Sequence, residues 1–360
     1  MEKGLCELCN PKQWKTVSTS ELTSTGYPVY GANGVIGYYS NYNHEKETLL
    51  ITCRGATCGT LNICKPFSYI NGNAMALDDL SDEIDIRYLY FFLLSRGLSD
   101  TITGSAQPQI VRQSLKNVKI IYPNLDAQKH IVYVLGKADE LLSIRKQQLA
   151  KLDELVKARF VEMFGESEYP CNSLISLIIE GAGLSYGIVQ PGDDGTGDMG
   201  VLRPVDFADG KIKTDSIKYI DRSLGDGFKK TELNGNELLI TVRGTTGITA
   251  LTDSRFKGMN VTRGIAVIRY DEKKIDPIYL NEYLKMEESQ QYIKEHTRGA
   301  TLQQINLSDL RDLKVIVPPL LLQQAFSAFV ERVDQQKQTV QQSLEKLELM
   351  KKALMQEYFG

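Results

Sequence analysis

The sequence has little of what membrane, secreted or strongly basic DNA-binding proteins depend on. None of its 360 residues belongs to a stretch approaching the roughly 18 apolar residues that a membrane-spanning helix needs. The first residues lack the cationic and apolar regions of a secretion signal. Six cysteines are too few for a disulfide scaffold, and 42 Lys and Arg against 45 Asp and Glu give a net charge of −3. These absences predict a cytoplasmic protein with reduced thiols and no broadly basic surface.

Motifs for catalysis are also missing. The sequence contains no Walker loop and no Asn-Pro-Pro-aromatic motif of adenine methyltransferases. The string at residues 195–200 fits G-x-G-x-x-G, but no expected strand precedes it. Cys6 and Cys9, with Cys53 and Cys58, leave zinc binding open as an alternative, although the C-x-x-C has no second close pair. We therefore predict no catalytic residue and no metal site in this chain.

The chain repeats itself. Leu-Leu-Ile-Thr at residues 49–52, followed by Arg54-Gly55, recurs 189 residues later with Arg243-Gly244. Gln109-Ile110 recurs 195 residues later, and so does the Phe-Gly pair at residues 164–165. A shift that grows along the chain indicates small insertions in loops between shared elements. The chain is therefore predicted to be a tandem duplication.

Each copy has the pattern of an α+β domain followed by a long helix. Short β-branched runs predict strands at residues 48–53, 118–122, 237–242, 265–270 and 313–317. Apolar spacing predicts short helices at residues 86–95 and 277–286. Gly136 is the only Gly or Pro between Ala127 and Phe164, and residues 320–359 contain none, so both segments should be helices of about 38 residues.

The two long segments carry a heptad pattern of apolar residues. They are Ile131, Leu135, Ala138, Leu142, Leu149, Leu152, Val156 and Met163, then Phe326, Val330, Val333, Val340, Leu344, Leu347, Leu354 and Tyr358. Charged residues interrupt the two patterns at different positions, which favours pairing of the helices with each other as an antiparallel coiled coil with pseudo-twofold symmetry. The alternative is two separate amphipathic helices, each packed on its own domain. Further apolar residues on these helices are expected to contact partner subunits: Leu141, Ile144, Leu155, Phe160, Leu349 and Met350.

The regions between the repeated motifs are unrelated in sequence. Residues 1–125 carry 11 Lys and Arg against 11 Asp and Glu, whereas residues 166–320 carry 19 against 23. We interpret the chain as two α/β recognition domains, residues 1–125 and 166–320, each followed by a spacer helix, residues 126–165 and 321–360. Two similar frames with different surfaces favour bipartite recognition over catalysis.

The duplication, the Leu-Leu-Ile-Thr-x-Arg-Gly turn, the Gly-x4-Gln-Ile element and the Phe-Gly helix ends resemble the specificity subunits of type I restriction-modification enzymes. The resemblance covers essentially the whole chain. It implies a noncatalytic subunit whose two target recognition domains bind the halves of a split double-stranded DNA sequence. It also implies two methyltransferase subunits that bind S-adenosylmethionine, and optional restriction subunits that use ATP and Mg²⁺. The alternatives are a specificity subunit of a related two-subunit or type II-like system, and a coiled-coil scaffold without DNA recognition.

Candidate DNA contacts are polar or cationic residues on Gly-rich turns, because such turns let the backbone approach a duplex. In the first domain they are Tyr30, Asn33, Arg54, Thr57, Gln107 and Gln109; in the second they are Tyr186, Arg203, Arg243, Thr245, Arg263, Arg298 and Gln303. Arg54 and Arg243 recur in both copies, which favours phosphate positioning or a shared ion pair. Tyr30, Asn33, Gln107, Tyr186, Arg203 and Gln303 do not recur and are the preferred candidates for base recognition.

Overall fold

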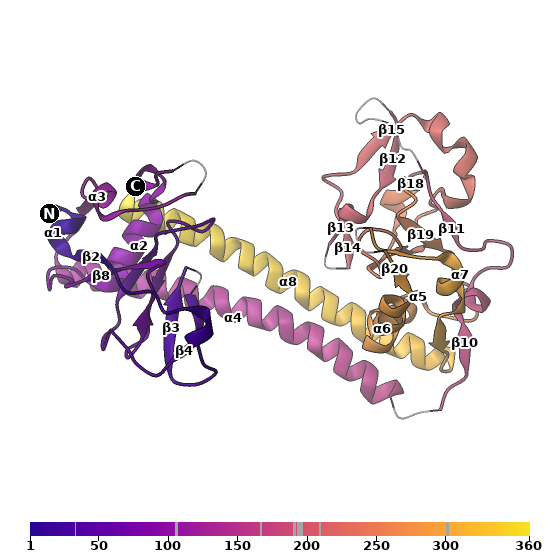
Figure 1. Ribbon diagram of the computed structural model, residues 1–360. Helices are drawn as coiled ribbons and strands as arrows, with labels where there is room; N and C mark the ends of the chain where they lie inside the picture. Colours follow the sequence, from indigo (N-terminus) through magenta and orange to yellow (C-terminus); the bar gives the residue numbers. More distant parts are fainter. Residues whose placement is uncertain are drawn as a thin grey trace. The chain divides into compact units, whose positions relative to one another are not determined.

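The protein is described from a computed structural model that covers residues 1–32, 34–104, 107–165, 168–189, 192, 197–208, 210–299 and 302–360 (Figure 1). The chain divides into two compact units: unit 1 is Met1–Gln148 with Val340–Gly360, and unit 2 is Leu149–Thr339. Two helices of 40 residues, α4 (Leu125–Phe164) and α8 (Leu320–Phe359), therefore each begin in one unit and end in the other. Both long helices were predicted, because Gly136 is the only Gly or Pro within the two segments.

Unit 1 contains three small sheets. A four-stranded sheet has the order β2 (Asn10–Gln13), β8 (Ala74–Asp78), β5 (Leu49–Thr52), β6 (Leu61–Ile63). A three-stranded sheet has the order β4 (Gly34–Tyr39), β3 (Tyr27–Gly31), β7 (Tyr69–Ile70). β1 (Glu2–Gly4) pairs with β9 (Lys119–Ile121). Only the β3–β7 pair is parallel among these strand pairs of the described residues.

Unit 2 repeats this topology strand by strand. Its four-stranded sheet has the order β11 (Ser185–Tyr186), β19 (Ile265–Ile268), β16 (Leu238–Thr241), β17 (Thr249–Leu251). Its three-stranded sheet has the order β15 (Lys218–Ile220), β12 (Met199–Leu202), β18 (Asn260–Val261), and β12 and β18 are again parallel. β10 (Cys171–Ser173) pairs with β22 (Lys314–Ile316). Unit 2 adds the pairs β13 (Phe207–Ala208) with β14 (Lys211–Ile212) and β20 (Thr297–Arg298) with β21 (Gln304–Ile305).

Short helices complete both units. The α-helices are α1 (Leu5–Leu8), α2 (Ile86–Arg96), α3 (Arg112–Leu115), α5 (Pro277–Lys285), α6 (Glu287–His296) and α7 (Leu307–Asp312). The 3₁₀ helices are Thr19–Glu21, Ser99–Thr101, Leu174–Leu177, Pro204–Asp206, Arg222–Thr231 and Ser254–Phe256. Helices α2 and α5 confirm the two short helices predicted from apolar spacing.

A duplicated hydrogen-bond arrangement joins each short helix to the start of a long helix. In unit 1, Asp85 caps α2, and its backbone N–H donates to Oε1 of the buried Gln128 at 2.8 Å. In unit 2, Asp276 caps α5, and its N–H donates to Oε1 of the buried Gln323, also at 2.8 Å. Because both glutamines lie in the first turns of α4 and α8, the entry geometry of the two long helices is the same.

Each unit has its own apolar core, and the end of a long helix completes it. In unit 1, the ring of Phe359 from the last turn of α8 packs 5.4 Å from the ring of Tyr88 on α2. In unit 2, the ring of Phe164 from the last turn of α4 packs 5.1 Å from Tyr279 on α5. The repeated Phe-Gly motif therefore marks a core residue in both copies.

Helices α4 and α8 pair antiparallel. Lys351 on α8 forms an ion pair with Asp139 on α4 within unit 1, and Lys337 pairs with Asp153 at 2.6 Å within unit 2. As the residue number rises on one helix it falls on the other, and every residue of the predicted heptad seam is buried or half-buried. Because the helices are copies of one another, their antiparallel pairing gives the helix pair a local pseudo-twofold symmetry. This confirms the predicted coiled coil.

The prediction for Phe160 was wrong. It was expected to be uncovered and available to a partner, but it is 6% exposed and belongs to the unit 2 core, where its ring lies 5.5 Å from that of Phe326. Near its end, α4 contacts both α8 and the globular part of unit 2, where the rings of Phe160 and Phe164 also pack on Tyr279, so more of its surface is buried there. The other five predicted docking residues are exposed: Leu141, Ile144, Leu155, Leu349 and Met350.

Candidate nucleic-acid interface

The candidate DNA contacts of unit 2 gather where three strands end. Thr262, just after β18, donates its N–H to the carbonyl of Leu202, the last residue of β12, at 2.9 Å. Val242, just after β16, donates to the carbonyl of Gly264 at 2.8 Å. We call the residues that follow these strands the strand-end edge. It contains three arginines, Arg203 after β12, Arg243 after β16 and Arg263 after β18.

Unit 1 has the same edge, built by the same backbone hydrogen bonds. Asn71, after β7, donates to the carbonyl of Tyr30 in β3 at 2.9 Å. Cys53, after β5, donates to the carbonyl of Asn73 at 3.0 Å. This register gives each arginine of unit 2 a counterpart in unit 1: Gly31 for Arg203, Arg54 for Arg243 and Gly72 for Arg263.

The repeated Arg-Gly turn and Gln-Ile element meet at this edge. In unit 2, Gly244 donates its N–H to the carbonyl of Gln303 at 2.9 Å, and in unit 1 Gly55 donates to that of Pro108 at 3.2 Å. Both glycines have left-handed backbones, with φ of 91° at Gly55 and 86° at Gly244. Other residues rarely adopt this conformation, which accounts for a glycine at both positions.

The arginines of the strand-end edge have different environments. The carboxylate of Asp206, which is fully buried, accepts from the Arg203 backbone N–H at 2.7 Å and from its guanidinium at 3.1 Å. The Arg203 guanidinium also donates to the carbonyl of Ser216 at 2.6 Å. Among the described residues, no carboxylate forms an ion pair with Arg54, Arg243 or Arg263. Arg54 is exposed, whereas Arg243 and Arg263 are half-buried.

Most of the remaining polar candidates lie on the surface. Those that are exposed are Thr57, Gln107, Gln109, Thr245, Arg298 and Gln303. Arg298 lies 3.6 Å from the carboxylate of Asp309. Tyr186 is half-buried and packs against the unit 2 core. Asn33 lies outside the described residues, as do residues 193–196 and Asp209.

Tyr30 is not a base-recognition residue, contrary to the prediction. Its side chain is 7% exposed and belongs to a small core with Leu50 and Ile70. Its hydroxyl accepts a hydrogen bond from the backbone N–H of Lys65 at 3.2 Å. Tyr30 lies inside β3, one residue before the strand ends, and its counterpart in unit 2 is the buried Leu202. The unrelated sequences around the two positions concealed this correspondence.

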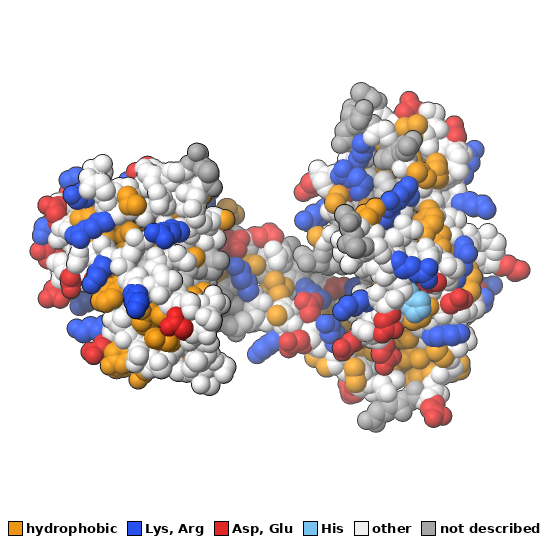
Figure 2. Space-filling model, in the orientation of Figure 1, with side chains coloured by type: hydrophobic (Ala, Val, Ile, Leu, Met, Phe, Trp, Pro, Cys, Tyr) orange, Lys and Arg blue, Asp and Glu red, His pale blue; other side chains and the backbone are white. Residues whose placement is uncertain are grey.

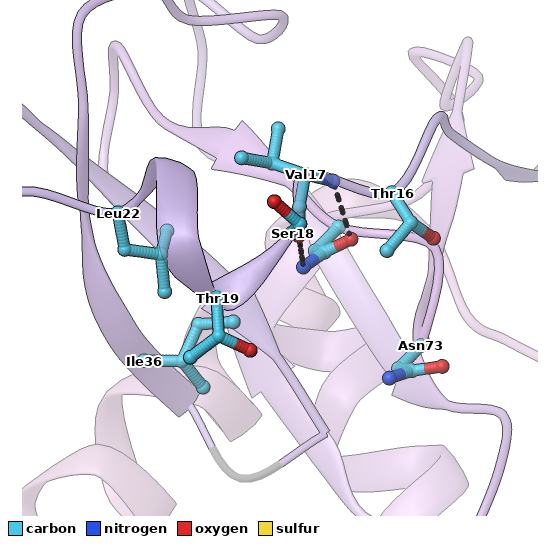
Figure 3. A pocket seen from close by; sticks show the side chains of 8 residues that line it. Thr16, Val17, Ser18, Thr19, Leu22, Ile36 and Asn73 are labelled. Atoms are coloured by element: carbon cyan, nitrogen blue, oxygen red, sulfur yellow. Dashed lines mark hydrogen bonds between the residues drawn. The ribbon is translucent and has the colours of Figure 1, made fainter.

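The strand-end edge of unit 1 borders an uncharged pocket of about 430 Å³ (Figure 3). Its lining residues carry hydroxyl, amide or aliphatic side chains, and none of those described is charged: Thr16, Val17, Ser18, Thr19, Leu22, Ile36, Asn71 and Asn73. The Asn71 side chain is held by two hydrogen bonds to the backbone of Val17, each 3.2 Å. Asn73 is exposed. Sequence analysis missed Asn73, because nothing in the pattern showed that residues 71–73 correspond to residues 262–264.

The four clustered cysteines are buried or half-buried free thiols. Within the described ranges, no three His, Cys, Asp or Glu side chains lie close enough together to hold a metal ion. Burial raises the pKa of the Cys9 thiol to about 12, and it also raises the pKa of Cys53 and Cys58.

The surface charge of unit 2 is locally concentrated although its net charge is not basic. Figure 2 shows Lys and Arg side chains over the part of unit 2 that contains β12, β18 and β20. The strand-end edge follows two of these strands, β12 and β18. None of the helices among the described residues has both the length and the apolar character needed to cross a membrane.

Comparison with known proteins identifies relatives of this chain. It is 25% identical over 313 residues to a putative type I restriction enzyme MjaX specificity subunit of Methanocaldococcus jannaschii, covering 81% of this chain and 71% of that protein. It is 24% identical over 337 residues to a putative specificity subunit of Haemophilus influenzae, covering 89% and 83%. The match to the EcoBI specificity subunit of Escherichia coli is 27% identical over 152 residues, and it spans 42% of this chain but 31% of that protein.

Solved structures share the fold. A type I restriction-modification S subunit from M. genitalium superposes over 100% of this chain and 96% of its own, with a TM-score of 0.64 and 17% identity. A chain from a study of complex assembly in the type I system gives a TM-score of 0.59 at 16% identity, with 100% and 97% covered. The family model for the type I restriction modification DNA specificity domain matches residues 1–154 and again residues 196–349. The chain therefore belongs to the family of type I restriction modification DNA specificity domains and carries two copies of that domain.

Proposed function

We propose that the chain is the specificity subunit of a type I restriction-modification system, and that each unit recognises one half of a split double-stranded DNA target. One observation carries this proposal: the two units present corresponding strand-end edges with different side chains. Sequence recognition depends on contacts with base edges, so two halves of different sequence require two different sets of side chains on one backbone frame. A protein scaffold without DNA recognition has no such requirement.

We assign Arg54 and Arg243 to phosphate contacts. Arg54 and Arg243 occupy the same position in both units, as expected for groups that contact phosphates and so position the duplex without distinguishing sequences. The near-neutral composition of unit 1 and the net negative composition of unit 2 limit the phosphate contacts that this chain makes alone. Since phosphate neutralisation supplies most nonspecific affinity, partner subunits should add many of these contacts.

The paired helices offer surfaces for those partners. Leu349 is 69% exposed and Leu155 is 45% exposed, and apolar side chains in such positions are stabilised when another protein covers them. We assign this role to two methyltransferase subunits, which would bind S-adenosylmethionine and methylate adenine. Restriction subunits that use ATP and Mg²⁺ would complete the assembly, and this chain would itself have no catalytic residue.

The test is to map methylated adenines genome-wide in a methylation-free host. The host expresses the chain with its methyltransferase subunit, or the methyltransferase subunit alone as the control. We expect one motif of two short defined sequences separated by a spacer of fixed length, and only when both subunits are present. Methylation without a common motif, or the same methylation with the methyltransferase alone, would contradict the proposal.

A further inference from the structure

The strand-end edges of the two units can be compared at three pairs of corresponding positions. Arg243 and Arg54 are the same residue, so this position carries no difference between the half-targets. Arg203 replaces Gly31, but its guanidinium already donates to Asp206 and to the carbonyl of Ser216. Arg263 replaces Gly72, and among the described residues no carboxylate pairs with it. The position of Arg263 and Gly72 is therefore the one at which the units differ and at which the arginine pairs with no carboxylate of the described residues.

The backbone around Arg263 is fixed on every side. Its N–H donates to the carbonyl of Ile188 at 2.9 Å, and the carbonyl of the next residue, Gly264, accepts from Val242 at 2.8 Å. The loop that joins β18 to β19 has only three residues, 262–264. A side chain on so short and well-anchored a loop loses little further conformational freedom when it binds, which favours a directed contact.

Unit 1 has no room for a side chain at the corresponding position. A Cβ atom on Gly72 would lie 2.5 Å from Oγ1 of Thr16 and 2.9 Å from the backbone oxygen of Trp14. Gly72 therefore leaves the edge of unit 1 without an equivalent of Arg263. The units therefore differ at this position in the packing around the backbone as well as in the side chain at the surface.

We infer that Arg263 is a specificity-determining residue that donates two hydrogen bonds to a guanine in the half-target bound by unit 2. Guanine presents O6 and N7 as two adjacent acceptors in the major groove, and the planar guanidinium matches them with two donors. Arg243 is then the phosphate-positioning group beside it, and the Arg203–Asp206 pair is a positioning element for the loop. This inference rests on the proposed DNA-recognition function.

The test measures methylation of a set of DNA duplexes by the full chain in complex with its methyltransferase subunit. Each duplex carries one base-pair change in the target. For Arg263→Ala we expect the preference for guanine at a single G·C pair in one half of the target to fall by roughly 5- to 150-fold. The preferences in the other half should not change. Arg263→Lys keeps the positive charge but lacks the two parallel donors of the guanidinium. Compared with Arg263→Ala, it should methylate the target better but show no greater preference for guanine.

Two arginine controls separate recognition from general affinity. Arg243→Ala should weaken methylation of all duplexes alike and reduce the slope of binding against salt concentration by about one. Arg255 is exposed, pairs with Asp253 and follows β17 at the opposite end of the sheet, so Arg255→Ala should change neither preference nor salt slope. Thermal unfolding checks that each variant is folded.

The outcomes distinguish the inference from the proposed function. If Arg263→Ala keeps the full guanine preference, or if both halves of the target change, the assignment of Arg263 is wrong while the proposed function stands. If the unmodified chain directs methylation to no defined motif, the proposed function itself fails.

Discussion

Units 1 and 2 have the same strand order, the same parallel strand pair and the same hydrogen bonds to a buried glutamine. The strand-end edge of unit 1 nevertheless carries one arginine, whereas that of unit 2 carries three. The edge is held by backbone groups: Thr262 and Asn71 donate the equivalent N–H whatever their side chains are. Such a frame tolerates changes at Arg54, Arg243 and Arg263, because these backbone bonds do not involve their side chains, whereas the Arg203 side chain is itself bonded to Asp206. The comparison teaches that geometry and recognition depend on separate groups of atoms in this fold.

Exchanging one unit gives the most direct test of that separation. Residues 168–318 can be replaced by the equivalent segment of another family member, which leaves α4 and α8 intact. We expect one half of the methylated motif to change completely and the other half and the spacer to stay the same. The reciprocal exchange of residues 1–122 should change the opposite half; a change in both halves after either exchange would show that the units are not independent.

The ends of the long helices allow a comparison of the two cores. Phe164 is 2% exposed, whereas Phe359 is half-buried, although both pack on the equivalent tyrosine. Phe164→Ala should lower the free energy of unfolding by about 3–5 kcal/mol, and Phe359→Ala by clearly less, since it leaves a smaller cavity. Urea unfolding measures both. Tyr133→Ala, at a side chain 65% exposed, is the control and should change stability by less than about 0.5 kcal/mol. Equal losses at the two phenylalanines would contradict the difference in burial.

The two buried glutamines should instead behave alike. Gln128→Ala and Gln323→Ala each remove a buried side chain that accepts from a partly buried backbone N–H, at Asp85 and Asp276. An unsatisfied buried group costs about 1–3 kcal/mol, and we expect losses in that range that agree within about 1 kcal/mol. Chemical denaturation provides the measurement, and the exposed Gln147→Ala is the matched control. A large loss in one unit alone would show that the duplicated arrangement is not energetically equivalent.

The lysines within the helix seam should have the smallest effects. Lys337→Met and Lys351→Met remove ion pairs with the partly exposed Asp153 and Asp139, so each should alter the free energy of unfolding by less than about 1 kcal/mol. Burial lowers the pKa of Lys337, but the hydrogen bond and charge of Asp153 outweigh it, and the net shift is upward. Because the folded pKa is raised, this contribution is present at neutral pH and is lost only as pH rises above about 10.5, the ordinary lysine value. Lys337→Met should therefore lower the free energy of unfolding more at pH 7 than at pH 11. A larger effect at pH 11 would contradict this prediction.

Local patterns in the sequence predicted the elements well and their contacts less well. The heptad positions and the absence of Gly and Pro predicted both long helices and their pairing, because periodicity is a property of consecutive residues. Phe160 was misassigned because periodicity identifies an apolar face but not what covers it. Tyr30 was misassigned because its counterpart, Leu202, lies in a segment without sequence similarity. The convergence of Arg203, Arg243 and Arg263 depends on the parallel pairing of β12 with β18, a long-range contact that no local pattern contains.

The route of the long helices has a consequence for biosynthesis. The core of unit 1 includes residues from the last turns of α8, among them Phe359, so a core that begins with residues 1–148 is completed by residues 340–360. Domains generally fold as their chain leaves the ribosome, but here the core of unit 1 keeps an uncovered apolar face until unit 2 and the end of α8 have been synthesised. A prematurely terminated product would therefore expose that face, which makes it a target for chaperones and proteases.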